Sequence, residues 1–314
     1  MSIYKKQYEA TDGTFYDISH YDTIIQDSCY GFNDRGEVLF CYVRDAISQE
    51  NRAKYRDAIR KVAKSKTKNR GRSAGKVDLK LFPKKAVAFC NKDGEEFTDG
   101  KDRYSVYYKQ EDGKVVNRCQ SNQTRCGVAG YFDKVAGLPC RQVGWSRDNV
   151  EKHNTLCELA KEIETTHKSY CETSYKFHSE RASLSPSFLF ADSIYSTMTL
   201  NYDFRTACHS DKGDLIGGLS TLTILEDKPN NYSGFYLGLP EYKIAFDIAD
   251  GGTLIFNAHE KHANTEYSVN SDELGIDDLT GNPFAGRIAI VCYLRDKLWM
   301  CPKENISDSN ESSN

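Results

Sequence analysis

The stretch FRTACHSDKGDLIGGLSTLTILED, residues 204–227, joins an H-x-D motif to a run of apolar and β-branched residues typical of a strand. In the motif, His209 and Asp211 lie two positions apart, and a second carboxylate follows at Asp214. Side chains at i and i+2 of an extended segment share one face, so the imidazole and the carboxylate can converge on one metal ion. Because such a motif also arises by chance, a metal site requires a third ligand elsewhere in the chain.

Short strand-like segments separated by turn residues surround this stretch from about residue 187 onward. In KIAFDIADGGTLIF, residues 243–256, Ile244, Phe246 and Ile248 alternate toward one side, and Asp250-Gly251-Gly252 turns the chain back. About seven short strands after a helical segment predict an α+β fold with a jelly-roll core (a double-stranded β-helix) and supporting helices packed on one sheet. The expected strands are FLFADSIYSTMTLNY, FRTACHS, LSTLTILE, SGFYLGL, YKIAFDI, GTLIF and RIAIVCYL.

Before these strands, the apolar pattern has helical spacing from Ser146 to about Arg181. Ser146 is expected to cap one long helix there. Its predicted core positions are Leu156, Leu159, Ala160 and Ile163. Another helix is expected from about Ser48 into a basic block, and AVAFC, YSVYY and KVVNRC are expected strands between residues 77 and 145.

These elements predict one integrated domain with three parts. Residues 1–145 would form a mixed α/β N-terminal elaboration, with a basic arm at residues 60–85. Residues 146–301 would form the jelly-roll core with its supporting helix. Residues 302–314 are polar and mildly acidic, so they are expected to be a disordered tail.

The charge is spread unevenly along the chain. The net charge is only −3, yet residues 60–85 hold eleven Lys or Arg and a single acid, Asp78. Such a block is either a solvated face or a mobile arm that grips a phosphate backbone, and the neighbouring Gly-Arg-Ser-Ala-Gly favours the arm. No apolar run approaches the roughly 18 residues of a membrane span, and the first residues lack the apolar region of a secretory signal. An intracellular protein without membrane contact is expected.

The eleven cysteines are scattered, without a C-x-x-C pair. Zinc sites need ligand pairs at short spacing, and Cys119 and Cys126 lie seven apart, which argues against structural zinc. The cysteines are therefore predicted to be reduced and mostly buried thiols.

The third ligand of a metal site could come from FNAHEKHANTEY, which offers His259 and His262, while Arg287 heads the strand RIAIVCYL. Two histidines and one carboxylate on one face of an octahedral iron(II) leave three positions open. There 2-oxoglutarate can chelate the metal, and an arginine can bind its far carboxylate through two parallel hydrogen bonds. The order H-x-D, His, Arg therefore predicts an iron(II) and 2-oxoglutarate site.

Three segments together resemble the TET/JBP family of iron- and 2-oxoglutarate-dependent dioxygenases, which oxidise the methyl group of 5-methylpyrimidines in nucleic acid. They are residues 204–227, SGFYLGLPEYKIAFDIADGGTLIFNAHEKHANTEY and GRIAIVCYLRDKL. The chain resembles the phage and algal members most, closely over about residues 187–300 and more weakly in NRGRSAGK and GYFDKVAGLPCR. This resemblance implies a viral or microbial origin.

The resemblance implies a role for each residue of the site. His209 and Asp211 would be the first two iron ligands. His262 would be the third in preference to His259, because the family's histidine precedes a small residue and then often Asn-Thr, as in His262-Ala263-Asn264-Thr265. Arg287 would bind the C5 carboxylate of 2-oxoglutarate.

The resemblance also points to residues that contact the base. Asp214 would hydrogen-bond the edge of the pyrimidine, and Tyr293 would stack on the flipped base. Arg295 stands where several relatives carry a histidine. Arg141 is a candidate for substrate binding, like Arg205, although either could be an ordinary ion-pair partner. Trp145 is expected to be a packing residue.

The expected reaction is oxidation of 5-methylcytosine in double-stranded methylated DNA to 5-hydroxymethylcytosine, by a protein that is expected to be a monomer. Asp214 can accept from the N4 amino group of cytosine, but it could equally accept N3–H of thymine while Arg295 donates to a carbonyl. A thymine hydroxylase that makes 5-hydroxymethyluracil is therefore the first alternative. Ascorbate as co-substrate, an oxygenase of free nucleotides, RNA or protein, and a metal-free jelly-roll binding protein are the others.

Overall fold

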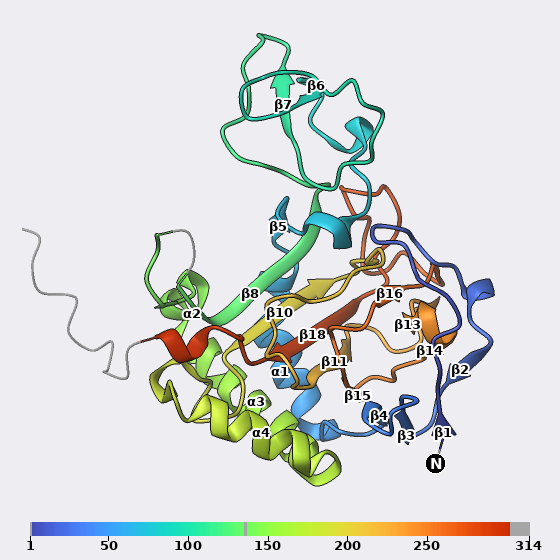
Figure 1. Ribbon diagram of the computed structural model, residues 1–314, viewed down its shortest axis with the longest axis vertical. Coiled ribbons are helices and arrows are strands. Elements are labelled where there is room, and N and C mark those ends of the chain that lie inside the picture. Colours follow the sequence, from blue (N-terminus) through green and yellow to red (C-terminus); the bar gives the residue numbers. More distant parts are fainter. Residues whose placement is uncertain (1, 135–136, 302–314) are drawn as a thin grey trace, which may run out of the picture.

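The computed structural model describes residues 2–134 and 137–301, and a large mixed sheet forms its centre (Figure 1). Within the described part of this sheet, neighbouring strands are antiparallel except for β1 and β3, which run parallel. In spatial order the strands are β1 (Ser2–Ile3), β3 (Cys29–Phe32), β4 (Val38–Val43), β15 (Thr253–Phe256), β11 (Ser220–Glu226), β18 (Arg287–Tyr293), β10 (Thr197–Tyr202), β8 (Thr124–Phe132) and β5 (Lys66–Thr67), and β9 (Arg141–Gln142) pairs with β8.

A second, smaller sheet covers one face of the large sheet. Apolar side chains from both sheets form one buried cluster, in which Leu222 and Phe256 of the large sheet meet Leu237 and Phe246 of the small one. Burial of such side chains contributes roughly 1.5–3 kcal/mol each, which makes this interface a main source of stability. The small sheet contains β16 (Ala263–Asn264), β13 (Leu237–Leu239), β14 (Ile244–Phe246) and β2 (Thr23–Ile25), and β12 (Tyr232–Gly234) pairs separately with β17 (Tyr267–Val269).

Helices cover the other face of the large sheet (Figure 1). Ile59 of α1 and Ile163 of α3 lie in one buried cluster with Leu200 of β10 and Ile290 of β18. The described residues thus form a sheet-rich α+β fold, as predicted. The helices are α1 (Gln49–Ala63), α2 (Gly144–Asp148), α3 (Val150–Tyr170) and α4 (Glu172–Ala182), and the 3₁₀ turns are η1 (Ile18–His20), η2 (Gly71–Ala74), η3 (Leu79–Leu81), η4 (Pro186–Phe188), η5 (Pro240–Tyr242) and η6 (Leu298–Met300). None of these helices has the length and apolar character of a membrane span.

The single long helix predicted from Ser146 to Arg181 is wrong, although its four core positions are buried as predicted. The chain leaves helical geometry at Asn149 and again at Cys171, where ψ is 61° and 54°. Ser146 does not cap a helix. It lies inside α2, and its hydroxyl oxygen accepts a hydrogen bond of 2.8 Å from the backbone N–H of Gly130.

Two strand predictions also differ from the structure. Residues 204–210 form no strand and contribute one isolated bridge, between His209 and His262. The strand β8 was not predicted, because Gly127 and Gly130 lower the strand propensity of its sequence. Helix α1 explains Gly127: a Cβ there would lie 2.4 Å from the backbone oxygen of Val62, so only glycine permits this close packing.

The turn after β14 changes sheets. Ile244, Phe246 and Ile248 point into the core between the sheets, as predicted. However, Asp250-Gly251-Gly252 leads from the small sheet to β15 of the large sheet, so the two strands are not a hairpin. Gly251 has φ of +77°, and a Cβ there would meet the guanidinium of Arg52 at 2.2 Å.

Residues 76–121 form a lobe that projects from the body (Figure 1). Its hairpin contains β6 (Ala86–Cys90) and β7 (Tyr107–Gln110), and it has its own apolar cluster around Phe82 and Tyr108. The chain enters and leaves the lobe at one point, where the side-chain amide of Asn122 donates to the carbonyl oxygens of Ala74 and Lys76 at 2.9 and 2.8 Å. The residues KVVNRC, predicted as a strand, contain a single isolated bridge, from Val115 to Lys109.

The predicted basic arm, residues 60–85, includes the end of α1, β5, η2 and η3. Arg60 lies in α1 and pairs with Asp227 at 2.7 Å, and Lys66 lies in β5 and pairs with Asp278. The ammonium group of Lys68 lies over the ring of Phe82, 4.9 Å from its centroid. These three of its eleven basic side chains therefore make internal contacts. The predicted tail, residues 302–314, lies outside the described residues.

The prediction that all cysteines are reduced is wrong for one pair. Cys140 and Cys301 form a disulfide that joins the segment after β8 to the end of the described chain. The spacing of 161 residues hides this pair from the sequence. The other nine cysteines are free, and six of them are buried, as predicted.

We expect His178 to lower the free energy of unfolding as the pH falls. Its Nε2 accepts the backbone N–H of Leu219 at 3.1 Å, and burial lowers its pKa to about 4 from an ordinary value of 6.5. The unfolded chain therefore takes up a proton below about pH 6.5 that the folded protein does not, and stability on the order of 2 kcal/mol is lost between pH 7 and pH 5. Urea unfolding of wild type and His178→Asn checks this. The free energy of unfolding of the variant should depend on pH less steeply than that of the wild type, by about one bound proton. Identical slopes for the two proteins would contradict the prediction.

Candidate metal centre and adjacent cavity

His209 and His262 are brought together by a pair of backbone hydrogen bonds. The N–H of each residue donates to the carbonyl oxygen of the other, at 3.0 and 2.9 Å. This isolated antiparallel bridge lies where the segment after β10 meets the segment before β16. Two residues that are far apart in the sequence therefore have a fixed distance between them.

Asp211 completes a cluster of three side chains. Its two carboxylate oxygens lie 3.6 Å from Nε2 of His209 and 3.7 Å from Nε2 of His262. The three candidate ligand atoms all lie within 4.8 Å of one another. Burial lowers the pKa of His209 to about 4, so its imidazole is neutral at neutral pH, as metal binding requires.

The hydrogen bonds of the two imidazoles suit a metal ion. Nδ1 of His209 lies 2.7 Å from the carbonyl oxygen of Ala207, and Nδ1 of His262 lies 2.9 Å from that of Glu260. A carbonyl can only accept, so each Nδ1 carries the proton and each Nε2 presents a lone pair toward Asp211. Two imidazole nitrogens and one carboxylate are the donor set of non-haem iron(II) oxygenases. The residues present therefore fit iron(II).

His259, the alternative third ligand, lies apart from this cluster. Its Nε2 is 3.4 Å from the carbonyl oxygen of Leu215, and its ring lines a separate shallow cleft with Lys6 and Lys261. The structure thus brings His262, and not His259, to His209 and Asp211.

A cavity of about 230 Å³ lies next to the three residues. Its walls come from both sheets. Every second residue of a strand points into the cavity, since side chains alternate between the two faces of a strand. They include Ala289, Val291 and Tyr293 of β18, Thr199 and Asn201 of β10, Leu222 of β11 and Leu237 of β13.

Asp214, Tyr293 and Arg295 lie together in the wall of this cavity. Asp214 is 5% exposed and accepts a hydrogen bond from the hydroxyl of Ser220, and burial raises the pKa of its carboxyl well above the ordinary value. Nε of Arg295 donates to Asp133 at 2.8 Å, and a terminal nitrogen of the same guanidinium lies 3.5 Å from the hydroxyl of Tyr293. A buried acid and a cation with free donors therefore face one space.

Arg287 is the first residue of β18, two residues before Ala289 and on the same cavity-facing side, but it does not line the cavity itself. Its guanidinium carbon is 4.6 Å from the centroid of the Phe235 ring, and only 4% of the residue is exposed. Burial lowers the pKa of Arg287, while Tyr232 and Glu226 oppose this shift. No carboxylate of the described residues lies within ion-pair distance of it, so a buried cation is left for an anionic ligand.

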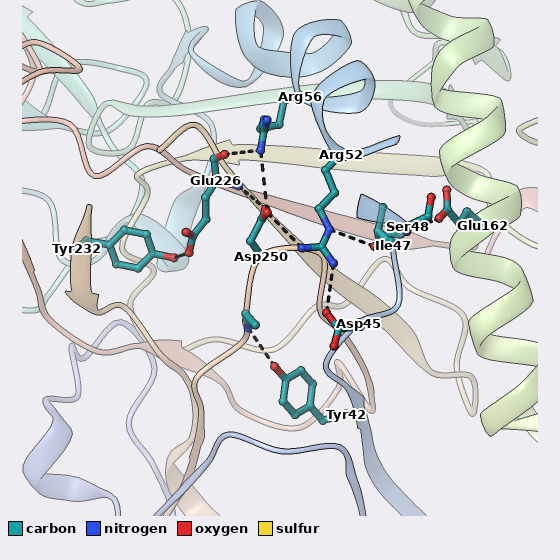
Figure 2. Close-up of polar contacts among 11 residues, drawn as sticks. Tyr42, Asp45, Ile47, Ser48, Arg52, Arg56, Glu162, Glu226, Tyr232 and Asp250 are labelled. Carbon is teal, nitrogen blue, oxygen red and sulfur yellow. Dashed lines mark hydrogen bonds and ion pairs between the residues drawn. The ribbon is translucent and has the colours of Figure 1, made fainter. Parts of the chain in front are cut away.

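A polar network holds Glu226, the residue that pairs with Arg287 across β11 and β18 (Figure 2). The carboxylate of Glu226 accepts the Tyr232 hydroxyl at 2.7 Å. The backbone carbonyl of Glu226 accepts from Arg56 at 2.8 Å, and its N–H donates to Asp250 at 2.9 Å. Helix α1 and the turn after β14 thus hold this end of β11 in place.

Three other predicted residues lie outside the cavity wall. Arg141 contacts the ring of Phe132 at 5.2 Å and donates to the carbonyl oxygen of Pro139. Arg205 pairs with Asp17 at 2.7 Å, which agrees with the ion-pair alternative. Trp145 packs against the helical core cluster.

Two residues of the site were missed by the sequence analysis. Arg70, counted as part of the arm, lines the cavity next to Asp211, and its Nε is buried without a hydrogen-bond partner in the described residues. Asn201 is 8% exposed, and its Oδ1 also lacks a partner there. Asn201 shares the inward face of β10 with Thr199, but which face points inward depends on the strand register, and the sequence alone does not give this register.

Comparison with known proteins finds similarity over more than half of the chain. A family model named Tet_JBP, described as the oxygenase domain of the 2OGFeDO superfamily, matches residues 127–296. The chain is 33% identical over 173 residues to the bifunctional helicase and thymine dioxygenase JBP2 of Trypanosoma brucei brucei. This alignment covers 54% of this chain and 15% of that protein. It is 30% identical over 175 residues to the thymine dioxygenase JBP1-B of Trypanosoma cruzi, covering 55% of this chain and 19% of that protein.

Among solved structures, NgTET1 in complex with 5mC DNA has a TM-score of 0.49 and 13% identity, over 96% of this chain and 84% of that one. The matched region spans less than a fifth of the two curated relatives named above. Proteins of the 2OGFeDO superfamily use iron(II) and 2-oxoglutarate, and the cluster of two histidines and one aspartate suits that metal. Because the family match covers more than half of the 314 residues, the chain belongs to the Tet_JBP family of oxygenase domains.

Proposed function

We propose that this protein is an iron(II)- and 2-oxoglutarate-dependent dioxygenase that oxidises the C5-methyl group of a pyrimidine in DNA. The observation that carries the proposal is the cluster of His209, Asp211 and His262 beside a cavity that also holds a buried acid and an arginine. Family membership supports the oxygenase chemistry. We assign thymine as the first base, because the named relatives are thymine dioxygenases.

The two facing sheets are proposed to be the double-stranded β-helix predicted from the sequence, with the cavity between them. The N-terminal residues belong to the same catalytic unit in this proposal, since β3 and β4 extend the large sheet and β2 extends the small one. The proposed division at residue 145 then separates an elaboration from a core within one domain.

His209, Asp211 and His262 would hold the iron, and Arg287 would bind the far carboxylate of 2-oxoglutarate. Arg70, with its unpartnered Nε beside Asp211, would stabilise the negative charge gathered at the metal. The chemistry that iron(II) and 2-oxoglutarate supply when bound is O₂-dependent hydroxylation of a C–H bond. The protein's own contribution is to orient the methyl group and to exclude water.

The base must leave the DNA stack to reach this cavity. Tyr293 would replace the lost stacking, and such contacts contribute roughly 1–3 kcal/mol. Asp214 would accept N3–H of thymine, and Arg295, held by Asp133, would donate to a carbonyl oxygen of the base. Arg141, beside Phe132, would contribute to DNA binding from outside the cavity.

The second candidate substrate is 5-methylcytosine. Asp214 favours it as well, since a buried carboxyl can accept the N4 amino group of cytosine. Arg295 would then donate to O2 or N3. Asp214 would accept N3–H from thymine but the N4 amino group from cytosine. Because the carboxyl can accept either donor, direct product analysis is the decisive test.

Product analysis on two matched duplexes tests the function. One duplex carries 5-methylcytosine in place of cytosine and the other is unmethylated; each is incubated with iron(II), 2-oxoglutarate and O₂, and the nucleosides are weighed. We expect thymidine to gain one oxygen in both duplexes, and His209→Ala to form no product. A gain on 5-methylcytosine alone would assign the second candidate. Succinate release without oxidised nucleoside would place the substrate outside DNA, and absence of both would overturn the proposed function.

A further inference from the structure

Ile216 is an exposed apolar side chain beside the cavity. It is 68% exposed, the largest exposed fraction among the large apolar residues that the structure describes. It follows Asp214, which lines the cavity, by only two positions, so their Cα atoms lie within about 7 Å of each other. Ile216 therefore lies close to the wall of the space that the proposed function assigns to a flipped base.

The backbone holds Ile216 firmly in this position. Its N–H donates to the Asp296 carboxylate at 3.1 Å, and the N–H of Asp296 donates to the carbonyl oxygen of Gly213 at 3.0 Å. The preceding residue, Leu215, is buried and donates to the carbonyl oxygen of Leu294 at 2.9 Å. The turn is thus fastened to the segment after β18, next to Arg295.

The surroundings of Ile216 suit a nucleic acid. Lys212 and Lys297 are exposed on the two fastened segments, and no carboxylate in the described residues pairs with either. Gly213 and Gly217 flank the tip without side chains, which leaves room for base pairs to approach. Trp299 and Met300 are also exposed on the segment after β18, close in sequence to Lys297. Apolar side chains between lysines can insert among bases while the lysines contact phosphates.

We propose that Ile216 inserts into the DNA base stack and fills the gap left by the flipped nucleotide, while Lys212 and Lys297 contact the flanking phosphates. This inference rests on the proposed function. Apolar wedges inserted between base steps compensate part of the cost of unstacking, and lysines neutralise the backbone on either side. The fixed backbone keeps the wedge rigid, so little conformational entropy is lost on insertion.

The test compares duplex and single-stranded substrates of the same sequence, because a single strand needs no wedge. The variant Ile216→Ala should lower kcat/KM on the duplex roughly tenfold or more, in line with unstacking energies. Its kcat/KM on the single strand should stay within about twofold of wild type. Ile216→Met, which keeps an apolar wedge, should restore most duplex activity. Fluorescence of 2-aminopurine beside the target base should report less unstacking with Ile216→Ala.

Ile3→Ala is the matched control, since Ile3 is also an exposed isoleucine, 62% exposed on β1. It should leave both substrates unaffected. Equal loss on duplex and single strand, or no loss on the duplex, would overturn the wedge and leave the proposed function standing. If wild-type protein oxidised neither substrate, the proposed function would fall and the wedge with it.

Discussion

Replacing His262 with alanine abolishes iron(II) binding and product formation, whereas replacing His259 leaves both close to wild type. This outcome is expected because Nε2 of His262 faces Asp211 at 3.7 Å, while His259 points toward the carbonyl oxygen of Leu215. Loss of an outer contact alone typically weakens metal binding 10–100-fold, so loss of a direct ligand should exceed about 100-fold. Anaerobic titration of iron(II), followed by calorimetry, measures the difference.

His259→Ala is the matched control, because it removes the same side chain only three positions away. Circular dichroism should show both variants folded. Stoichiometric iron binding by His262→Ala, or its loss in His259→Ala, would exchange the roles of the two histidines. Binding retained in Asp211→Ala and His209→Ala as well would remove the metal centre from this site altogether.

The second large effect concerns Arg287. Its replacement by alanine should raise KM for 2-oxoglutarate at least about 30-fold, since loss of one partner of a buried charge pair costs about 2–5 kcal/mol. Arg287→Lys should recover only part of this loss, because an ammonium cannot form two parallel hydrogen bonds to a carboxylate. Succinate formation as a function of 2-oxoglutarate concentration measures both variants.

Iron(II) binding separates this effect from misfolding, since Arg287 does not touch the metal cluster and both variants should still bind iron. Arg147→Ala, which removes an exposed arginine paired with Asp148, is the control. An unchanged KM in Arg287→Ala would mean that the carboxylate of the co-substrate binds elsewhere. Turnover with ascorbate in the absence of 2-oxoglutarate would mean that ascorbate is the co-substrate.

The sequence predicted the parts of the site that follow from local patterns. His209 and Asp211 stand out because they are two residues apart, and Arg287 because it heads an unbroken apolar strand. His262 was chosen over His259 by resemblance, since both lie in one short segment and nothing local separates them. The structure supports that choice through the backbone bridge between His209 and His262.

Arg70 and Asn201 were missed for a physical reason. Arg70 is far from the motif in the sequence, and its charge merged with ten other basic residues into an apparent arm. Tertiary contacts bring this segment to the cavity, among them the pairing of β5 with β8 and the hydrogen bond from the N–H of Ala207 to the carbonyl oxygen of Ser73. Asn201 lies in a strand whose register with β18 decides which face points inward, and register depends on partners that a single sequence does not reveal.

The same limit applies to the fold. Strands with β-branched and apolar residues, such as β11 and β18, were predicted, whereas β8 was hidden by glycines that its contact with α1 demands. The helical breaks at Asn149 and Cys171 occur without proline or glycine. Tertiary packing overrides local preference at such positions.

The closed stem of the projecting lobe has a consequence for how this protein could change over time. Residues 76–121 leave and rejoin the body at Asn122, and they lie outside the region matched by the family model. Tyr104 and Ser121 of the lobe hydrogen-bond to Asp12 and Arg70 of the body, but the rest of the lobe can change in length without moving β8 or the metal cluster, because its ends already meet. The lobe is thus a variable module: evolution or engineering can alter it to change what the protein touches, while the metal cluster stays in the body.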